Sequence, residues 1–156
     1  MNLTPIVLFV YDRPDHVRQT VEALKKNVLA LDSELFIYSD AAKNKNGEDK
    51  VNKVRQYIKN IDGFKKVTIF ERKKNLGLAG SIIDGVTKIV NDYGKVIVLE
   101  DDLVTSPFFL KYMNQALELY KYEVRVASIH GYIYPIENLP ETFFIKGADC
   151  WGWATW

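Results

Sequence analysis

The chain has 156 residues, of which 47% are hydrophobic and 26% charged, and its net charge is +1. This composition excludes a disordered, collagen-like or fibrous chain, and the length suits one globular domain with its own hydrophobic core. The single cysteine, Cys150, excludes a disulfide framework and a cysteine-based zinc site, and the near-neutral charge gives no reason to expect a nucleic-acid partner.

The first element along the chain is a predicted buried strand. Its apolar run from Ile6 to Tyr11 is six residues long, whereas a membrane span needs about 18. The residues before it carry no positive charge and no long apolar segment, so they do not resemble a signal peptide. We therefore expect no transmembrane segment and a cytoplasmic location, with peripheral contact to a membrane surface left open.

Helical and strand patterns then alternate up to residue 129. Pro14 suits the first position of a helix, and apolar residues recur at helical spacing from Val17 to Val28. Later strands are predicted over residues 35–39, 67–70, 95–99 and 125–129. Later helices are predicted over residues 51–61, 78–90 and 109–120, the last of them after a cap at Ser106-Pro107.

Strands that are separated by helices predict an α/β fold with a mostly parallel central sheet and helices on both faces. The chain shows no internal repeat, low-complexity tract or linker, so residues 1–156 are expected to form a single domain. In open sheets of this kind, ligands bind beyond the carboxyl ends of the strands.

Polar residues follow three of the predicted strands at that position. Arg13 comes after the first strand, Asp40 after the second, and the triplet Glu100-Asp101-Asp102 after the fourth. Three consecutive carboxylates repel one another, and Mg²⁺ or Mn²⁺ bound together with phosphate oxygens would relieve the repulsion. A hydrated surface loop is the alternative, which the fully apolar strand before the triplet disfavours.

Charge is also unevenly distributed along the chain. Residues 1–75 carry 15 basic and 10 acidic side chains, and residues 76–156 carry 6 basic and 10 acidic ones. Solvated helix faces account for much of this difference. A cleft with one cationic and one acidic wall is the alternative, and it would suit a phosphorylated ligand bound with a divalent metal.

The segment from Asn75 to Ser81 opens the third predicted helix with small residues. Such residues allow a ligand to approach the backbone N–H groups at the positive end of a helix. The pattern is neither the dinucleotide-binding glycine motif nor a phosphate-binding P-loop. A loop whose glycines only serve helix packing therefore stays equally open.

Taken together, these motifs resemble a glycosyltransferase of the Rossmann-like GT-A fold. The order strand–Asp-Arg-Pro, strand–Asp, Asn-Leu-Gly–helix and strand–Glu-Asp-Asp is similar to family 2 enzymes. The Glu-Asp-Asp motif resembles that of the N-acetylglucosaminyltransferase I group. The segment from Gly147 to Trp153 is similar to the Gly-Trp segment of these enzymes. The resemblance covers essentially the whole chain, but only the amino-terminal two thirds of such a catalytic domain.

This resemblance implies an activity. It implies transfer of a hexosyl or N-acetylhexosaminyl group from a nucleotide-sugar donor, UDP-linked, to a hydroxyl of a glycan or lipid-linked acceptor. The reaction would be inverting and would depend on Mn²⁺ or Mg²⁺ held by a motif of the DXD type. A bacterial polysaccharide pathway would suit such an enzyme.

The resemblance also assigns roles to individual residues. Arg13 would contact the nucleotide or its diphosphate, Asp40 would accept from the uracil N–H, and Asp102 would bind the metal. The residues expected on the nucleotide-sugar side are Val10, Tyr11, Arg13, Asp40, Asn75, Gly77, Glu100 and Asp101. Those expected on the acceptor side are Trp151, Gly152 and Trp153.

The catalytic base is not identified by the resemblance. In the resembled families this carboxylate lies downstream of the Gly-Trp segment, so we expect it beyond Trp156. All three tryptophans fall within the last six residues, and a free tail of that composition would expose a large apolar surface. We therefore expect a fragment that binds the donor but transfers sugar poorly or not at all. A magnesium-dependent nucleotidyltransferase-like protein is the remaining alternative.

Overall fold

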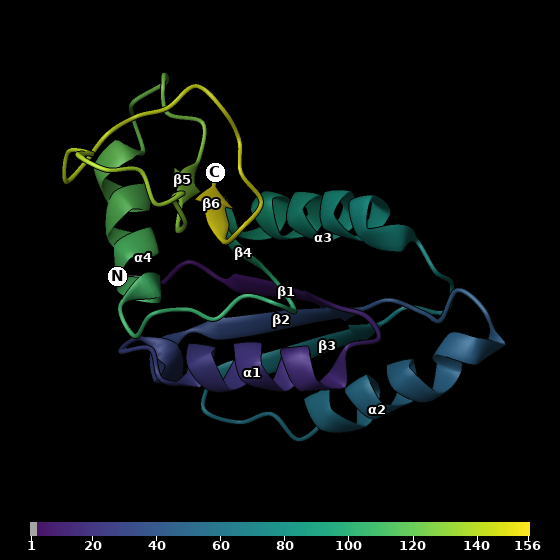
Figure 1. Ribbon diagram of the computed structural model, residues 1–156. Coiled ribbons are helices and arrows are strands. Elements are labelled where there is room, and N and C mark those ends of the chain that lie inside the picture. The colour runs from purple at the N-terminus through teal and green to yellow at the C-terminus, as the bar shows by residue number, and fades with distance from the viewer. Residues whose placement is uncertain (1–2) are drawn as a thin grey trace.

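The computed structural model describes residues 3–156 as a six-stranded sheet with helices on both faces (Figure 1). The strand order is β3-β2-β1-β4-β6-β5. The strands are β1 (Ile6–Val10), β2 (Glu34–Ser39), β3 (Lys66–Glu71), β4 (Val96–Glu100), β5 (Ile129–His130) and β6 (Trp153–Thr155). The α-helices are α1 (Pro14–Lys25), α2 (Glu48–Ile58), α3 (Gly77–Tyr93) and α4 (Phe109–Tyr120), and η1 (Ala30–Asp32) and η2 (Lys45–Gly47) are short 3-10 helices.

The α/β class with a mostly parallel sheet is confirmed. Strands β3, β2, β1 and β4 are mutually parallel, and Phe9 of β1 is in register with both Tyr38 of β2 and Glu100 of β4. Because the strands are parallel, their carboxyl ends lie along one edge of the sheet. Arg13, Asp40 and the acidic triplet follow these ends, so the topology gathers the predicted site residues at that edge.

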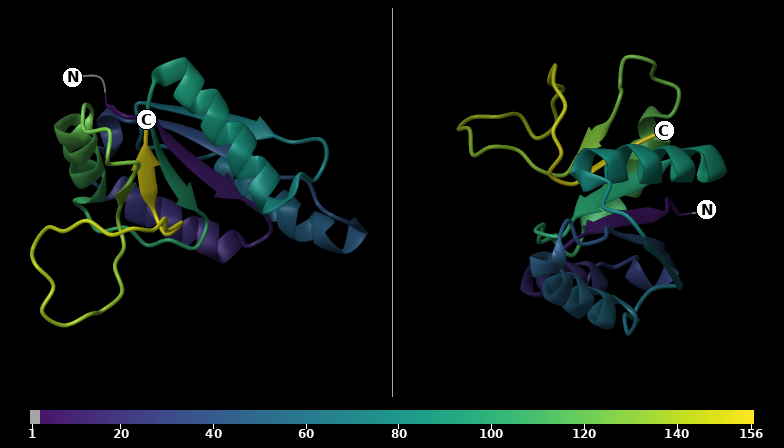
Figure 2. Two further views of the ribbon diagram at one scale, coloured as in Figure 1. Left: turned by 90° about the horizontal axis from the view of Figure 1, so that it is seen from above. Right: turned by 90° about the vertical axis from the view of Figure 1, so that its right-hand side faces the viewer.

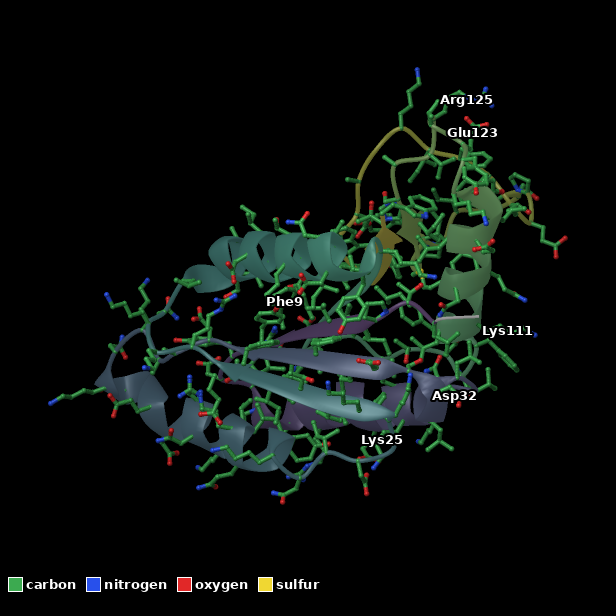
Figure 3. All side chains as sticks on the ribbon, turned by 180° about the vertical axis from the view of Figure 1, so that it is seen from behind. Phe9, Lys25, Asp32, Lys111, Glu123 and Arg125 are labelled. Atoms are coloured by element: carbon green, nitrogen blue, oxygen red, sulfur yellow. The ribbon has the colours of Figure 1, made fainter. Side chains whose placement is uncertain are left out.

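Alternate residues of the central strands build two cores, one on each face of the sheet. On one face, the strands pack against α1, α2 and α4 through residues such as Leu8, Ile37 and Leu99, which are almost fully buried. On the other face, Phe9, Tyr38 and Val98 pack with α3. Figure 3 places Phe9 in the layer between α3 and the sheet. This alternation is the expected period of a strand that is buried on both sides.

The carboxy-terminal part of the chain differs from the prediction. The strand expected at 125–129 is wrong except for its last residue, because β5 comprises only Ile129 and His130. The tail is not free either: β6 inserts between β4 and β5 and pairs antiparallel with both. Ala154 is fully buried, while residues 131–152 extend from the sheet as a long loop (Figure 2).

Helix α4 has the predicted bounds, but the ends of α1 and α2 and the predicted cap of α4 differ from the prediction, and α2 covers Glu48–Ile58 instead of residues 51–61. The first helix ends at Lys25, and Val28, which was expected on its buried face, is exposed and donates its N–H to Pro107 instead. Helix α4 begins at Phe109 without a side-chain cap, although the hydroxyl of Ser106 does accept the N–H of Phe108 at 3.4 Å. Among residues 3–156, no helix is both long enough and apolar enough to cross a membrane.

Candidate functional site

A cavity of about 380 Å³ opens at the carboxyl ends of β1, β2 and β4, below the start of α3. Every residue that the sequence predicted on the nucleotide-sugar side contributes to its wall. The lining residues are Phe9, Val10, Tyr11, Arg13, Tyr38, Asp40, Lys43, Asn75, Gly77, Leu78, Ser81, Glu100 and Asp101. The predicted residues are thus brought together, although their positions along the chain span 92 residues, from 10 to 101.

Asp40 joins the end of β2 to the start of α3. Its carboxylate is only 6% exposed and accepts the backbone N–H groups of Ala41, Leu76 and Gly77 at 2.9 to 3.1 Å. The positive end of a helix favours a carboxylate at this position. The N–H of Leu76 contacts both oxygens, so each carboxylate oxygen accepts two N–H groups and all of the roughly four acceptor positions are used within the chain. Gly77 has a φ of 71°, which glycine adopts without strain.

Arg13 connects the end of β1 to the acidic triplet. Its guanidinium forms ion pairs with both neighbouring carboxylates, donating to Asp101 and, at 3.0 Å, to Asp102. Asp101 is 3% exposed and also accepts the N–H of Tyr11 at 3.3 Å. Burial raises the pKa of Asp101, while the charge of Arg13 opposes that rise. Arg13 thus compensates a carboxylate that would otherwise be buried alone.

Glu100 also faces the cavity, and the charge of Arg13 opposes the rise of its pKa only in part. Burial raises its pKa, and the negative charges of Asp102 and Asp101 raise it further. Within the described part of the chain, its carboxylate accepts no hydrogen bond and forms no ion pair. A half-buried carboxylate with unused acceptor capacity is suited to bind a ligand that carries hydroxyl groups.

The residues present fit a divalent cation that is shared with a ligand. Over residues 3–156, no three histidine, cysteine, aspartate or glutamate side chains converge as a complete metal cage. Mg²⁺ commonly takes only one or two protein carboxylates together with phosphate oxygens, so a complete cage is not required. Asp102 is suited to this role because its side chain is 42% exposed and Arg13 engages only one of its oxygens.

The cavity wall combines both signs of charge. Arg13 and Lys43 come from the basic first half of the chain, and Glu100 and Asp101 come from the acidic second half. The two signs of charge do not form separate walls, because Asp40 comes from the first half of the chain and Arg13 pairs directly with Asp101. The remaining basic excess decorates solvated surfaces, as in the exposed pair of Lys53 with Asp49.

The residues predicted on the acceptor side do not line this cavity. Trp151 lies in an aromatic cluster at the base of the 131–152 loop, with ring centroids 4.7 Å from Tyr132 and 6.0 Å from Tyr134. Gly152 packs closely against the Phe109 ring. Trp153 lies in β6 and packs against the core beneath α3.

Five lining residues were not predicted to belong to the site. They are Phe9, Tyr38, Lys43, Leu78 and Ser81. Phe9 and Tyr38 belong to apolar strands and are indistinguishable from ordinary core residues in the sequence. Ser81 does belong to the small-residue segment that begins at Asn75, which was the available signal.

Comparison with known proteins identifies the family to which the chain belongs. Residues 6–146 match glycosyl transferase family 2. No curated protein matches the chain. The fold resembles the mannosyltransferase PcManGT from Pyrobaculum calidifontis, solved in complex with GDP-Man and Mn²⁺, with a TM-score of 0.58 and 12% identity over 80% of this chain and 34% of that one.

A second similar structure is that of residues 1–349 of S. aureus TarS. Its TM-score is 0.54, with 11% identity over 76% of this chain and 33% of that chain. At these identities the likeness concerns the fold alone. The chain spans about a third of the length of these two structures.

Proposed function

We propose that this chain, which belongs to glycosyl transferase family 2, binds the nucleoside diphosphate part of a nucleotide-sugar donor in the cavity at its strand ends. The observation that supports this proposal is the convergence of all eight residues predicted on the donor side around one cavity. The activity is transfer of the sugar to a hydroxyl group of a glycan acceptor.

The geometry suggests how the donor would be held and activated. A leaving diphosphate develops negative charge, and Arg13 already lies at the carboxyl end of β1, where that charge would form. A divalent cation held by Asp102 would supply Lewis-acid stabilisation of the same group. Glu100 and Asp101 would accept hydrogen bonds from ribose or sugar hydroxyl groups, and Val10 and the Tyr11 ring would flank the base.

The finer assignments extend the resemblance seen in the sequence. We propose a UDP-linked donor, a metal-binding Glu-Asp-Asp motif like that of the N-acetylglucosaminyltransferase I group, and inversion at the transferred carbon. We further propose that residues 1–156 form the donor-binding part of a longer catalytic domain, with Trp151 to Trp153 on its acceptor side. The match to about a third of each similar structure supports only the proposal of a longer catalytic domain.

The experiment is a calorimetric titration of UDP and of GDP, with Mn²⁺ present and again with EDTA. We expect binding that requires Mn²⁺ and is lost in Asp102→Asn, because that carboxylate would hold the metal. Asp32→Asn is the matched control, since Asp32 is exposed in η1 and precedes the amino end of β2, at the opposite edge of the sheet. Failure of the unchanged protein to bind either nucleotide would overturn the proposal.

A further inference from the structure

The loop of residues 41–47 is held beside the cavity by Tyr11, which follows β1, and by Asn75, which precedes α3. The hydroxyl of Tyr11 accepts the backbone N–H of Lys43 at 3.1 Å. The side-chain amide of Asn75 donates to the carbonyl of Ala41 at 2.7 Å, and Asp40 accepts the Ala41 N–H at 2.9 Å. These contacts hold the loop beside the cavity, although it carries several exposed polar residues.

Lys43 is the residue that this attachment brings to the cavity wall. Only two basic residues among those described line the cavity, Arg13 and Lys43. Arg13 is already engaged with Asp101 and Asp102. In the region covered by the structure, the ammonium group of Lys43 forms no ion pair or hydrogen bond, so its charge is available to a ligand.

The cavity wall carries more negative than positive side chains, and the ammonium group of Lys43 offsets part of this excess. Asp40, Glu100 and Asp101 contribute three carboxylates, and the one guanidinium nearby is shared between two acids. The divalent cation proposed at Asp102 would offset part of this negative charge, and a further cation facing the cavity would favour an anionic diphosphate. A lysine is a flexible point charge with three donors, which suits contact with phosphate oxygens.

We propose that Lys43 contacts the diphosphate of the bound donor, and that Tyr11 acts as a positioning residue whose hydroxyl holds the 41–47 loop in place for that contact. This inference rests on the proposed nucleotide-sugar function. It separates two roles of Tyr11, because the ring would flank the base while the hydroxyl acts through the loop.

The test compares UDP with uridine, each titrated at fixed Mn²⁺ concentration. Lys43→Gln should raise the Kd for UDP by about threefold to tenfold and leave the Kd for uridine unchanged, because only UDP carries phosphate. The dependence of UDP binding on salt concentration should also become shallower in this variant. Lys45→Gln is the matched control, since Lys45 is exposed in the same loop but does not line the cavity.

The positioning role has its own readout. Tyr11→Phe keeps the ring and removes only the hydroxyl, so it should weaken UDP binding but not uridine binding. In the double variant with Lys43→Gln, the loss should not exceed that of Lys43→Gln alone, because both changes remove one contact. Additive losses would overturn the positioning role of Tyr11.

Two results would overturn the phosphate contact. One is an unchanged affinity of Lys43→Gln for UDP together with an unchanged salt dependence. The other is an equal loss of UDP and uridine affinity, which would place Lys43 against the nucleoside. These two results leave the proposed function intact, because the unchanged protein still binds UDP. If the unchanged protein bound neither UDP nor GDP, the proposed function itself would fail, and this inference with it.

Discussion

The carboxylate of Asp40 accepts the backbone N–H of Gly77 at 2.9 Å, so the residue that follows β2 also fixes the first residue of α3. Helix α3 forms one wall of the cavity, and its start is held by this one buried side chain. Binding geometry and helix stability therefore depend on the same group.

Asp40→Ala should lower the free energy of unfolding by about 1–3 kcal/mol, because three backbone N–H groups lose their acceptor. Urea denaturation measures the effect. Asp40→Asn keeps one acceptor oxygen and should lose less, and Asp32→Ala, at an exposed position, should change little. Equal stability of Asp40→Ala and the unchanged protein would contradict the role of Asp40 at the start of α3.

Glu100→Gln should raise the free energy of unfolding at pH 7 by about 0.5–1 kcal/mol. The pKa of Glu100 is raised in the folded state, so its ionised form is disfavoured there. The contribution of Glu100 to the free energy of unfolding is fully present below its unfolded pKa of about 4.3. It is lost as the pH rises through the pKa of the folded state. The advantage of the glutamine variant should therefore disappear at pH 3, as denaturation at several pH values would show.

Glu123→Gln is a control in which the free energy of unfolding at neutral pH should change in the opposite direction to that of Glu100→Gln. Hydrogen bonds from Arg125 lower the pKa of Glu123 to about 2, so its contribution is present above the unfolded pKa and is lost as pH falls through about 2. This variant should lose stability at neutral pH. A gain in both variants would show that the effect of Glu100 does not come from its ionisation.

Gly85→Ala should destabilise the protein by about 1–3 kcal/mol and weaken nucleotide binding. A Cβ atom at Gly85 would lie 2.8 Å from the buried Phe9 ring, which lines the cavity. Gly80→Ala in the same helix meets only the Leu76 side chain at 3.4 Å and should stabilise by about 0.5–1 kcal/mol. Thermal denaturation and UDP titration of both variants test this contrast, and similar behaviour of the two would refute it.

Ala154→Asp should lower Tm by about 5–10 °C and promote aggregation. Ala154 is fully buried between β4 and β5, so the new charge would be desolvated and the edge of β4 would open. Cys150→Asp introduces the same charge at an exposed position and should have little effect. If Ala154→Asp kept the original Tm, β6 would not be part of the stable sheet.

The parallel half of the fold was predictable because each strand is a short apolar run between turn residues, as in Ile6 to Val10. The antiparallel part of the sheet was not predictable. Strands β5 and β6 have only two and three residues, which is too short for an alternation of apolar and polar residues to be recognised. Their existence depends on pairing between segments far apart in the chain, such as His130 with Trp153.

The residues of the site also fall into a predictable group and an unpredictable group. Charged residues at strand ends, such as Arg13 and Asp40, were found because their position in a parallel sheet has a chemical meaning. Residues such as Tyr38 and Phe9 were missed because an apolar strand residue near a cavity looks like any core residue. The hydroxyl contact of Tyr11 with the 41–47 loop depends on the path of that loop, which no local pattern specifies.

The two ways in which β4 is paired have a consequence for the order of folding. On one side, β1 pairs with β4 through four residue pairs and is itself paired with β2, so β4 joins a sheet of four parallel strands. On the other side, β6 pairs with β4 through three residue pairs and with β5 through two. The β5–β6 pair has the fewest strand contacts, so it should join late and open first. Amide hydrogens of β6 should then exchange with solvent sooner than those of β1, while the floor of the cavity stays protected.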